Sequence, residues 1–139
     1  MALLYHGTDA EFDGFSDAAP GTREGSANNS ALGIWFFADR RHAENFGART
    51  LEADVELGRS WRLPLSEFVR LDREAETLDM DAAGSALAFW RAKRAELAGL
   101  GYDSVAIVER NGETCIHVVL RASSITAVRD LPRGPSCGM

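Results

Sequence analysis

Residues Gly33–Gly47 read GIWFFADRRHAENFG, and the rest of the chain is interpreted outward from this stretch. Its first half, Ile34–Phe37, is a short apolar and aromatic run that is typical of a buried strand. Its second half is polar, but Ala43 and Phe46 are three residues apart, as on one face of a helical turn. A strand that passes directly into a helix gathers its last side chains and the first helical amides around one point. Such a junction suits an anionic or stacked ligand.

The chain has 139 residues, which is the commonest size of a single domain, and no Pro/Gly/Ser-rich linker divides it. We expect one domain over residues 1–130 and a flexible tail over 131–139, where prolines and glycines are frequent. With 45% hydrophobic and 26% charged residues, the composition is that of an ordinary globular protein. The net charge of −6 argues against a nonspecific grip on nucleic-acid phosphates.

No apolar run approaches the roughly 20 residues that span a bilayer, and the N-terminus lacks a basic region followed by an apolar stretch. We therefore expect no membrane partner and no signal peptide in the chain given. It would be a cytoplasmic protein or a domain delivered as a secreted effector. Cys115 and Cys137 have no metal-type spacing and are expected to be free thiols. The three histidines are scattered, so we expect no metal site.

Local patterns predict a mixture of strands and helices. Asn111 and Gly112 form a strong tight-hairpin signal. Asp79 or Asp81 is expected to cap a helix that runs to about residue 98. Residues 17–32 lack any period and are expected to be a long loop. Strands are expected at Ala2–Tyr5, Ile34–Phe37, Thr50–Leu57, Ser104–Val108, Thr114–Leu120 and Ser124–Val128, a turn at Gly58–Pro64, and a short helix or irregular piece at Leu65–Leu71.

Tyr5–Thr8 read YHGT at the end of the first expected strand. Taken alone, His6 favours a structural role, and Trp35 and Phe46 favour positions in a core. Their order is more specific: YHGT, a long loop, a glycine and an aromatic strand, a helix with a small residue and a second aromatic, and later GYDSV leading to a hairpin. In this order the chain resembles the ADP-ribosyltransferase superfamily over about Leu3–Val128. The resemblance is to the branch of diphtheria-type toxins, poly(ADP-ribose) polymerases and phage or polymorphic-toxin transferases.

The resemblance implies an α+β fold: a split pair of small β-sheets with flanking helices and a central cleft that binds NAD as co-substrate. His6 would hydrogen-bond the adenosine-side ribose of NAD. Gly7 would offer its backbone to the nicotinamide amide, and Thr8 would complete this part of the cofactor site.

The resemblance assigns the aromatic residues to nicotinamide. Trp35 and Phe46, eleven residues apart, would face each other across the nicotinamide ring, and the small side chain of Ala43 would leave the ring room. The loop that ends at residue 32 would lie over the bound NAD.

In this family a carboxylate on a late strand holds the ribose 2′-hydroxyl and stabilises the positive charge that develops as nicotinamide leaves. Aligning Ser123–Thr126 with the family's segment after that strand puts Ile116 at this position. The nearest acid on the same hairpin is Glu113, which we take as catalytic together with His6. Glu113 and Ile116 face opposite sides of an unbroken strand, so Glu113 needs a bulge or the hairpin geometry to reach the site. Otherwise it is a solvated residue beside the Asn-Gly turn.

The resulting hypothesis is a mono-ADP-ribosyltransferase that moves ADP-ribose from NAD to an unidentified acceptor, a protein in preference to a nucleic acid or small molecule. Small domains of this type resemble toxin or effector modules. A neutralising immunity protein or antitoxin would then be expected, and a basic one would complement the charge of −6. Two alternatives stay open: an NAD glycohydrolase with water as acceptor, and a catalytically inactive module that binds NAD or ADP-ribose.

Overall fold

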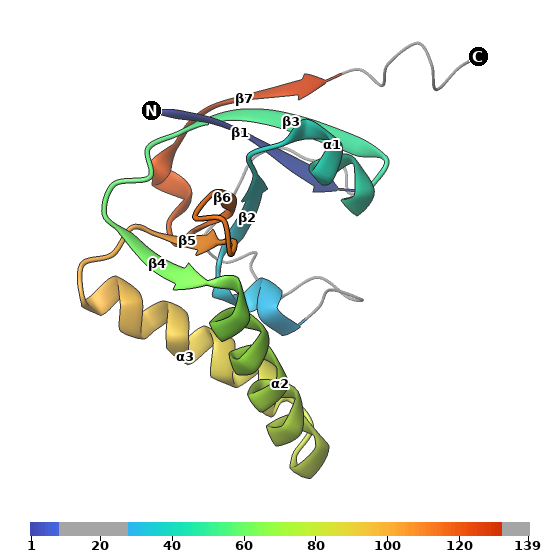
Figure 1. Cartoon of the computed structure of the whole chain (residues 1–139), viewed down its shortest axis with the longest axis vertical. Helices are drawn as coiled ribbons and strands as arrows, with labels where there is room; N and C mark the ends of the chain where they lie inside the picture. Colours follow the sequence, from blue (N-terminus) through green and yellow to red (C-terminus); the bar gives the residue numbers. More distant parts are fainter. Residues whose placement is uncertain (9–27, 132–139) are drawn as a thin grey trace.

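The computed structural model describes residues 1–8 and 28–131, which form strands, helices and short 3-10 turns (Figure 1). The expected loop lies outside the described residues up to residue 27, and so do residues 132–139 of the expected tail. The strands are β1 (Ala2–Thr8), β2 (Ile34–Phe37), β3 (Arg49–Val55), β4 (Ser60–Pro64), β5 (Ser104–Val108), β6 (Thr114–Val119) and β7 (Ile125–Leu131); the helices are α1 (Arg40–Ala43), α2 (Leu65–Asp81) and α3 (Ser85–Gly99); the 3-10 turns are η1 (Asn28–Leu32), η2 (Glu44–Phe46) and η3 (Ala122–Ser124).

The strands form one sheet in the order β4-β5-β6-β2-β1-β3-β7. Neighbouring strands are antiparallel except β4 and β5, which are parallel. Two halves, β4-β5-β6-β2 and β1-β3-β7, join where β1 and β2 pair at Tyr5 and Phe37. The predicted α+β class is confirmed. The expected pair of separate sheets is instead a single sheet, because this narrow joint connects its halves.

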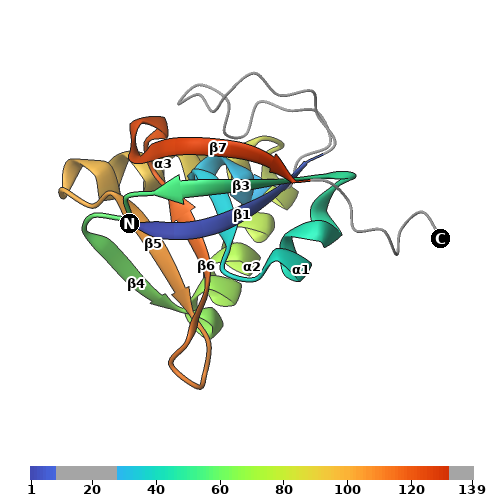
Figure 2. The ribbon, with the colours of Figure 1, turned by 90° about the horizontal axis from the view of Figure 1, so that it is seen from above.

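The core consists of two hydrophobic clusters. The β4-β5-β6-β2 half packs on α2 and α3, with Trp90 and Leu97 of α3 buried against Val105 and Ile107 of β5. The second cluster brings β1, β2, β3 and β6 together around Phe36, which is fully buried. Burying such a side chain contributes roughly 1.5 to 3 kcal/mol. Figure 2 shows β1, β3 and β7 side by side.

Two elements differ from the sequence prediction. Residues 58–64 were expected to turn, but Ser60–Pro64 is the edge strand β4, paired in parallel with β5. A five-residue strand with a distant parallel partner has little local signal. The expected piece at Leu65–Leu71 extends to Asp81 as α2. Only Ala75 of this helix is fully buried, and so few core positions give a weak apolar period.

The predicted cap and hairpin are present. Asp79 lies in α2, but its Oδ1 accepts hydrogen bonds from the backbone N–H groups of Gly84 (2.9 Å) and Ala86 (3.2 Å), at the start of α3. It therefore satisfies amides that the helix leaves unpaired. The hairpin between β5 and β6 turns at Gly112, which has a φ of 86°. The last strand runs to Leu131, one residue into the expected tail.

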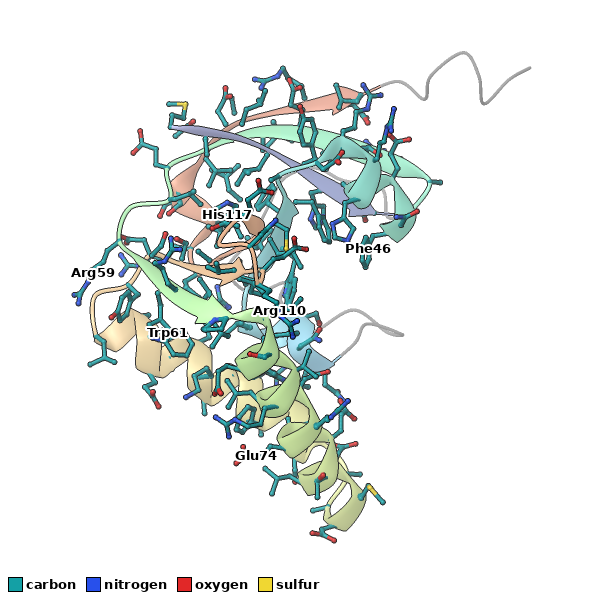
Figure 3. The ribbon with its side chains drawn as sticks, in the orientation of Figure 1. Phe46, Arg59, Trp61, Glu74, Arg110 and His117 are labelled. Atoms are coloured by element: carbon teal, nitrogen blue, oxygen red, sulfur yellow. The ribbon has the colours of Figure 1, made fainter. Side chains whose placement is uncertain are left out.

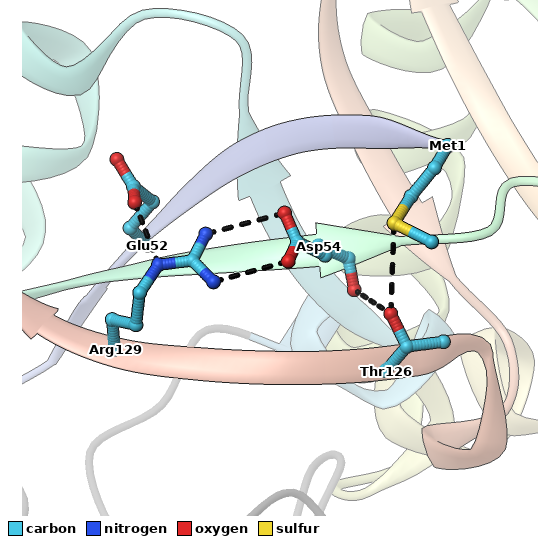
Figure 4. Close-up of polar contacts among 5 residues, drawn as sticks. All are labelled: Met1, Glu52, Asp54, Thr126 and Arg129. Carbon is cyan, nitrogen blue, oxygen red and sulfur yellow. Dashed lines mark hydrogen bonds and ion pairs between the residues drawn. The ribbon is translucent and has the colours of Figure 1, made fainter.

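The outer face of the β1-β3-β7 half carries a polar network (Figure 4). Arg129 of β7 donates to Glu52 Oε1 (2.8 Å) and to both carboxylate oxygens of Asp54 on β3 (3.0 and 3.2 Å). The hydrogen bond from Arg129 lowers the pKa of Asp54. Thr126 donates to the Asp54 carbonyl oxygen (3.2 Å), beside the register shift between β3 and β7. Since these groups are exposed, their ion pairs contribute little to stability.

Candidate functional site

His6 fastens β1 to β2. Its Nδ1 lies 2.6 Å from the carbonyl oxygen of Trp35. A carbonyl oxygen can only accept, so the Nδ1 atom carries the hydrogen in this contact. The imidazole ring also lies 5.6 Å from the ring of Phe36, in the cluster between the two halves of the sheet. The orientation of His6 is therefore fixed by β2, at the joint of the sheet.

Gly7 is required by the close approach of the segment that follows β2. A Cβ atom at this position would lie 2.0 Å from the carbonyl oxygen of Ala43 and 3.1 Å from Cβ of Phe46. Thr8, at the end of β1, is buried, and so is Ala43. Since a backbone carbonyl cannot move as a side-chain tip can, a side chain at position 7 would displace α1 and η2. The structure thus brings the YHGT motif directly against the end of the Gly33–Gly47 stretch.

Phe46 belongs to a cluster of three rings. It stacks on Phe37 with ring centroids 4.7 Å apart and an interplanar angle of 18°, and His42 lies 4.5 Å from Phe37. Phe37 is buried with 4% of its surface exposed, whereas Phe46 is 55% exposed (Figure 3). One face of the Phe46 ring is thus held by a core residue while much of the ring faces outward. An exposed aromatic on a rigid support suits a planar ligand.

Trp35 is held by η1 and α2. Its indole Nε1 donates to the carbonyl oxygen of Asn29 (3.3 Å), and its ring meets Phe68 of α2 edge-on at 5.5 Å. The resemblance places Trp35 opposite Phe46, and the ring stacked on Phe46 is Phe37. Strand alternation puts Trp35 and Phe37 on one face of β2. Phe37 is the last residue of the strand, and this position was the signal in the sequence that could have identified it.

The β5–β6 hairpin lies on the other side of β2. Ile116 pairs with both Phe37 and Ile107, and the Ala38 N–H donates to the Cys115 carbonyl oxygen (3.1 Å). The next pair in β5 and β6 is Val108 with Thr114, so Cys115 is an extra residue, a β-bulge. The bulge reverses the alternation beyond it. Glu113 is therefore assigned to the same face of the sheet as Ile116, which an unbroken strand would forbid.

Glu113 stands at the exposed end of this hairpin. Its N–H donates to Asn111 Oδ1 (2.9 Å), and its carbonyl oxygen accepts from the Glu109 N–H (2.9 Å). Glu109 and Glu113 thus flank the turn, and each carries a carboxylate. Burial raises the pKa of the nearby Cys115 thiol, and the Glu109 carboxylate raises it further. At neutral pH Cys115 is therefore a thiol, not a nucleophilic thiolate.

His117 is oriented into the core. It pairs with Phe36 of β2 and Ala106 of β5, and it lies between the two halves of the sheet (Figure 3). Its Nδ1 is buried without a hydrogen-bond partner among the described residues. Burial lowers the pKa of this imidazole, so His117 is neutral at pH 7. It is a packed histidine, and the bulge places it on the face opposite to the one assigned to Glu113.

Within residues 1–8 and 28–131, His, Cys, Asp and Glu side chains do not gather in threes as metal ligands would. In the same residues, no helix combines the length and the apolar sequence that crossing a membrane requires.

Comparisons with known proteins assign no family. No protein-family model matches the sequence, and no curated protein matches it. A solved structure described as the crystal structure of an anti-CRISPR protein aligns with 93% of this chain and 94% of its own, at 18% identity and a TM-score of 0.49. Similarity at this level assigns neither family nor function.

Proposed function

We propose that this protein is a mono-ADP-ribosyltransferase that takes ADP-ribose from NAD. The observation that carries the proposal is the contact of Gly7 with Ala43 and Phe46, because it unites the two motifs of the sequence resemblance in one site. We call this group, with His6, the β1–η2 junction. The sheet supports the proposal too, since the described strands of its two halves pair with each other at the β1–β2 joint beside this junction.

NAD supplies the transferred group: the bond from ribose C1′ to nicotinamide breaks with its electron pair going to nicotinamide, and the acceptor nucleophile bonds to C1′ and releases its proton. His6 is held by the Trp35 carbonyl, so its ring is orientated in advance to hydrogen-bond a ribose hydroxyl. Gly7 presents backbone without a side chain, and Phe46 offers a ring for the nicotinamide to stack on. Thr8 and Ala43 are buried supports of this site. Trp35 lies on the same face of β2 as Phe37, and we propose that it borders the site from there.

Glu113 is the proposed catalytic carboxylate. The bulge at Cys115 supports this role, because it meets the condition under which Glu113 shares the face of Ile116 and Phe37. A carboxylate there stabilises the positive charge that develops at C1′, which exists mainly in the transition state. The acceptor is unidentified, and we propose a protein.

One observation favours a second function. Ile116 occupies the position that the resemblance gives to the carboxylate, and it packs beside the α2–α3 core. A module that binds NAD or ADP-ribose without cleaving it would need no carboxylate there.

The experiment is to incubate the pure protein with NAD and to measure nicotinamide release by chromatography and NAD binding by calorimetry. Wild-type protein should release nicotinamide, and Glu113→Gln should slow release by about a hundredfold, the usual cost of losing one transition-state contact. Glu67→Gln, at an exposed position of α2, is the control and should release nicotinamide normally. Free ADP-ribose without a modified macromolecule would identify a glycohydrolase. Binding without release would identify the inactive module.

A further inference from the structure

Three hydrogen bonds connect helix α2 to the indole of Trp35 through the turn η1. Asn29 Nδ2 donates to Asp72 Oδ1 (3.3 Å), and Asn28 Nδ2 donates to Glu76 Oε1 (3.1 Å). The carbonyl oxygen of Asn29 then accepts from the Trp35 indole Nε1 (3.3 Å). A carboxylate can only accept, so each amide must turn its nitrogen toward α2. The arrangement of the asparagine side chains is therefore dictated by the acids.

The turn η1 is also held by hydrophobic packing. Ala31 and Leu32 are buried in the cluster of α2 and α3. On its other side the Trp35 ring meets Phe68 of α2 edge-on. Helix α2 thus holds the indole twice, once by a direct ring contact and once through Asn29.

Asp72 is the half-buried member of this set. The groups that face it are Asn29 from η1, Glu76 from α2 and the indole of Trp90 from α3. The Trp90 Nε1 makes no hydrogen bond of ordinary length among the described residues, but it lies close enough to favour the charged carboxylate. Burial is the largest influence and raises the pKa of Asp72. The hydrogen bond from Asn29 opposes this shift, so the contact between the two side chains favours the ionised carboxylate.

We propose that Asp72 and Asn29 are positioning residues that fix the Trp35 indole beside Phe37 and so set the β2 wall of the NAD site. The part that concerns NAD rests on the proposed function. Trp35 and Phe37 are neighbours on one face of β2, and Phe37 carries Phe46. A tilt of the indole therefore changes the surface next to the stacked rings without altering any residue that touches the reacting atoms.

The test uses the full chain labelled with 15N and compares the hydrogen exchange of the tryptophan indole N–H groups. Asp72→Ala and Asn29→Ala should each speed exchange at Trp35 by about fivefold, the ratio that matches one hydrogen bond of ordinary net strength. Exchange at Trp61, on the edge strand β4, should not change. Asp72→Asn retains an acceptor oxygen and should restore slow exchange. Glu74→Ala removes an exposed acid of the same helix and is the matched control.

A second readout separates this proposal from the function. The Asp72→Ala and Asn29→Ala variants should raise the KM for NAD by about fivefold and leave kcat unchanged. The Asp72→Ala change should have no further effect on KM in a Trp35→Phe background. Unchanged indole exchange in both variants would overturn the positioning role, whether or not NAD is cleaved. If exchange responds but wild-type protein neither binds nor cleaves NAD, the positioning of Trp35 stands and the proposed function fails.

Discussion

The last residue of β2, Phe37, has a different neighbour on each side. On one side is the β1–η2 junction, where Gly7 lies directly against the Ala43 carbonyl and Phe46 stacks on Phe37. On the other side is the β5–β6 hairpin, where Ile116 pairs with Phe37 and Glu113 stands exposed beyond a bulge. The β1–η2 junction is closely packed, because a backbone carbonyl and stacked rings make its contacts. The position of Glu113 on the hairpin depends on one extra residue, Cys115.

Under the proposed function, this difference would separate NAD binding from NAD cleavage. The junction presents a fixed surface that fits a planar ligand, and its parts come from the motifs of the resemblance. The hairpin supplies Glu113, the carboxylate that we assign to the reaction, and the face on which it lies follows from the register of β5 and β6. A change at the junction should therefore affect the fold and NAD binding, whereas a change at the hairpin should affect cleavage.

The largest effect is expected from Gly7→Ala. The new Cβ would lie 2.0 Å from the Ala43 carbonyl, so β1 or α1 must shift. We expect a loss of about 3 kcal/mol in the free energy of unfolding, at the upper end for overpacked sites. Urea denaturation measures it. Gly99→Ala is the control, since no atom lies within 4 Å of a Cβ there. A Gly7→Ala protein as stable as wild type would mean that the junction is not rigid.

Inserting one alanine between Ile107 and Val108 tests the hairpin. The added residue gives Cys115 a partner in β5 and so removes the bulge. Glu113 then lies on the face opposite Ile116, and nicotinamide release should fall by about a hundredfold, as in Glu113→Gln. Cys115→Ser keeps the bulge and should retain activity. Circular dichroism and NAD binding would establish that the insertion variant is folded. Full release by a folded insertion variant would remove the register from the mechanism.

A smaller effect is expected from Phe46→Ala. Loss of one stacked ring should weaken NAD binding by about tenfold, at the upper end for an aromatic pair. Stability should change little, because Phe46 is 55% exposed. Calorimetry gives the affinity. Leu100→Ala removes a side chain of similar exposure, 59%, far from the junction in the chain, and should bind NAD normally. Equal affinities in the two variants would contradict stacking on Phe46.

The smallest effect is expected from Arg129→Ala, outside both regions. Arg129 lowers the pKa of Asp54, so its contribution to stability is present above the unfolded pKa of about 3.8 and is lost as the pH falls below it. Thermal unfolding at pH 7 should show a slight loss of stability in the variant, and this loss should shrink as the pH falls below about 3.8. A loss that keeps its size at low pH would indicate packing by the arginine stem instead of the ion pair.

Sequence patterns predicted the parts of the fold that have strong local signals. Ile34–Phe37 and Ser104–Val108 are strands with the expected bounds, and the hairpin turns at Asn111-Gly112. Asp79 accepts hydrogen bonds at the start of α3, as expected of a capping side chain, but it does so from within α2, and the N-cap position itself is Gly84. The elements that were missed, β4 and the second half of α2, depend on a distant parallel partner and on a helix with one fully buried residue. Neither element therefore shows a clear hydrophobic period in its own sequence.

The candidate site was predictable in its members but not in its geometry. The order of motifs selected His6, Gly7 and Phe46, and the structure brings them together. The resemblance paired Trp35 with Phe46, whereas in the structure the indole of Trp35 is held by Asn29 of η1 and Phe37 is the ring stacked on Phe46. The bulge at Cys115 arises from the pairing of β5 with β6, and the alternation of residues within one strand carries no information about that pairing.

The most direct measurement is a titration of NAD into 15N-labelled protein, followed residue by residue through the backbone amide signals. Binding at the β1–η2 junction should shift the amides of Gly7, Ala43 and Phe46 with one common dissociation constant. The amides of Thr126 and Arg129, on the outer face, should not move. Shifts absent from the junction at millimolar NAD, or confined to the outer face, would contradict an NAD site there and with it the proposed reaction.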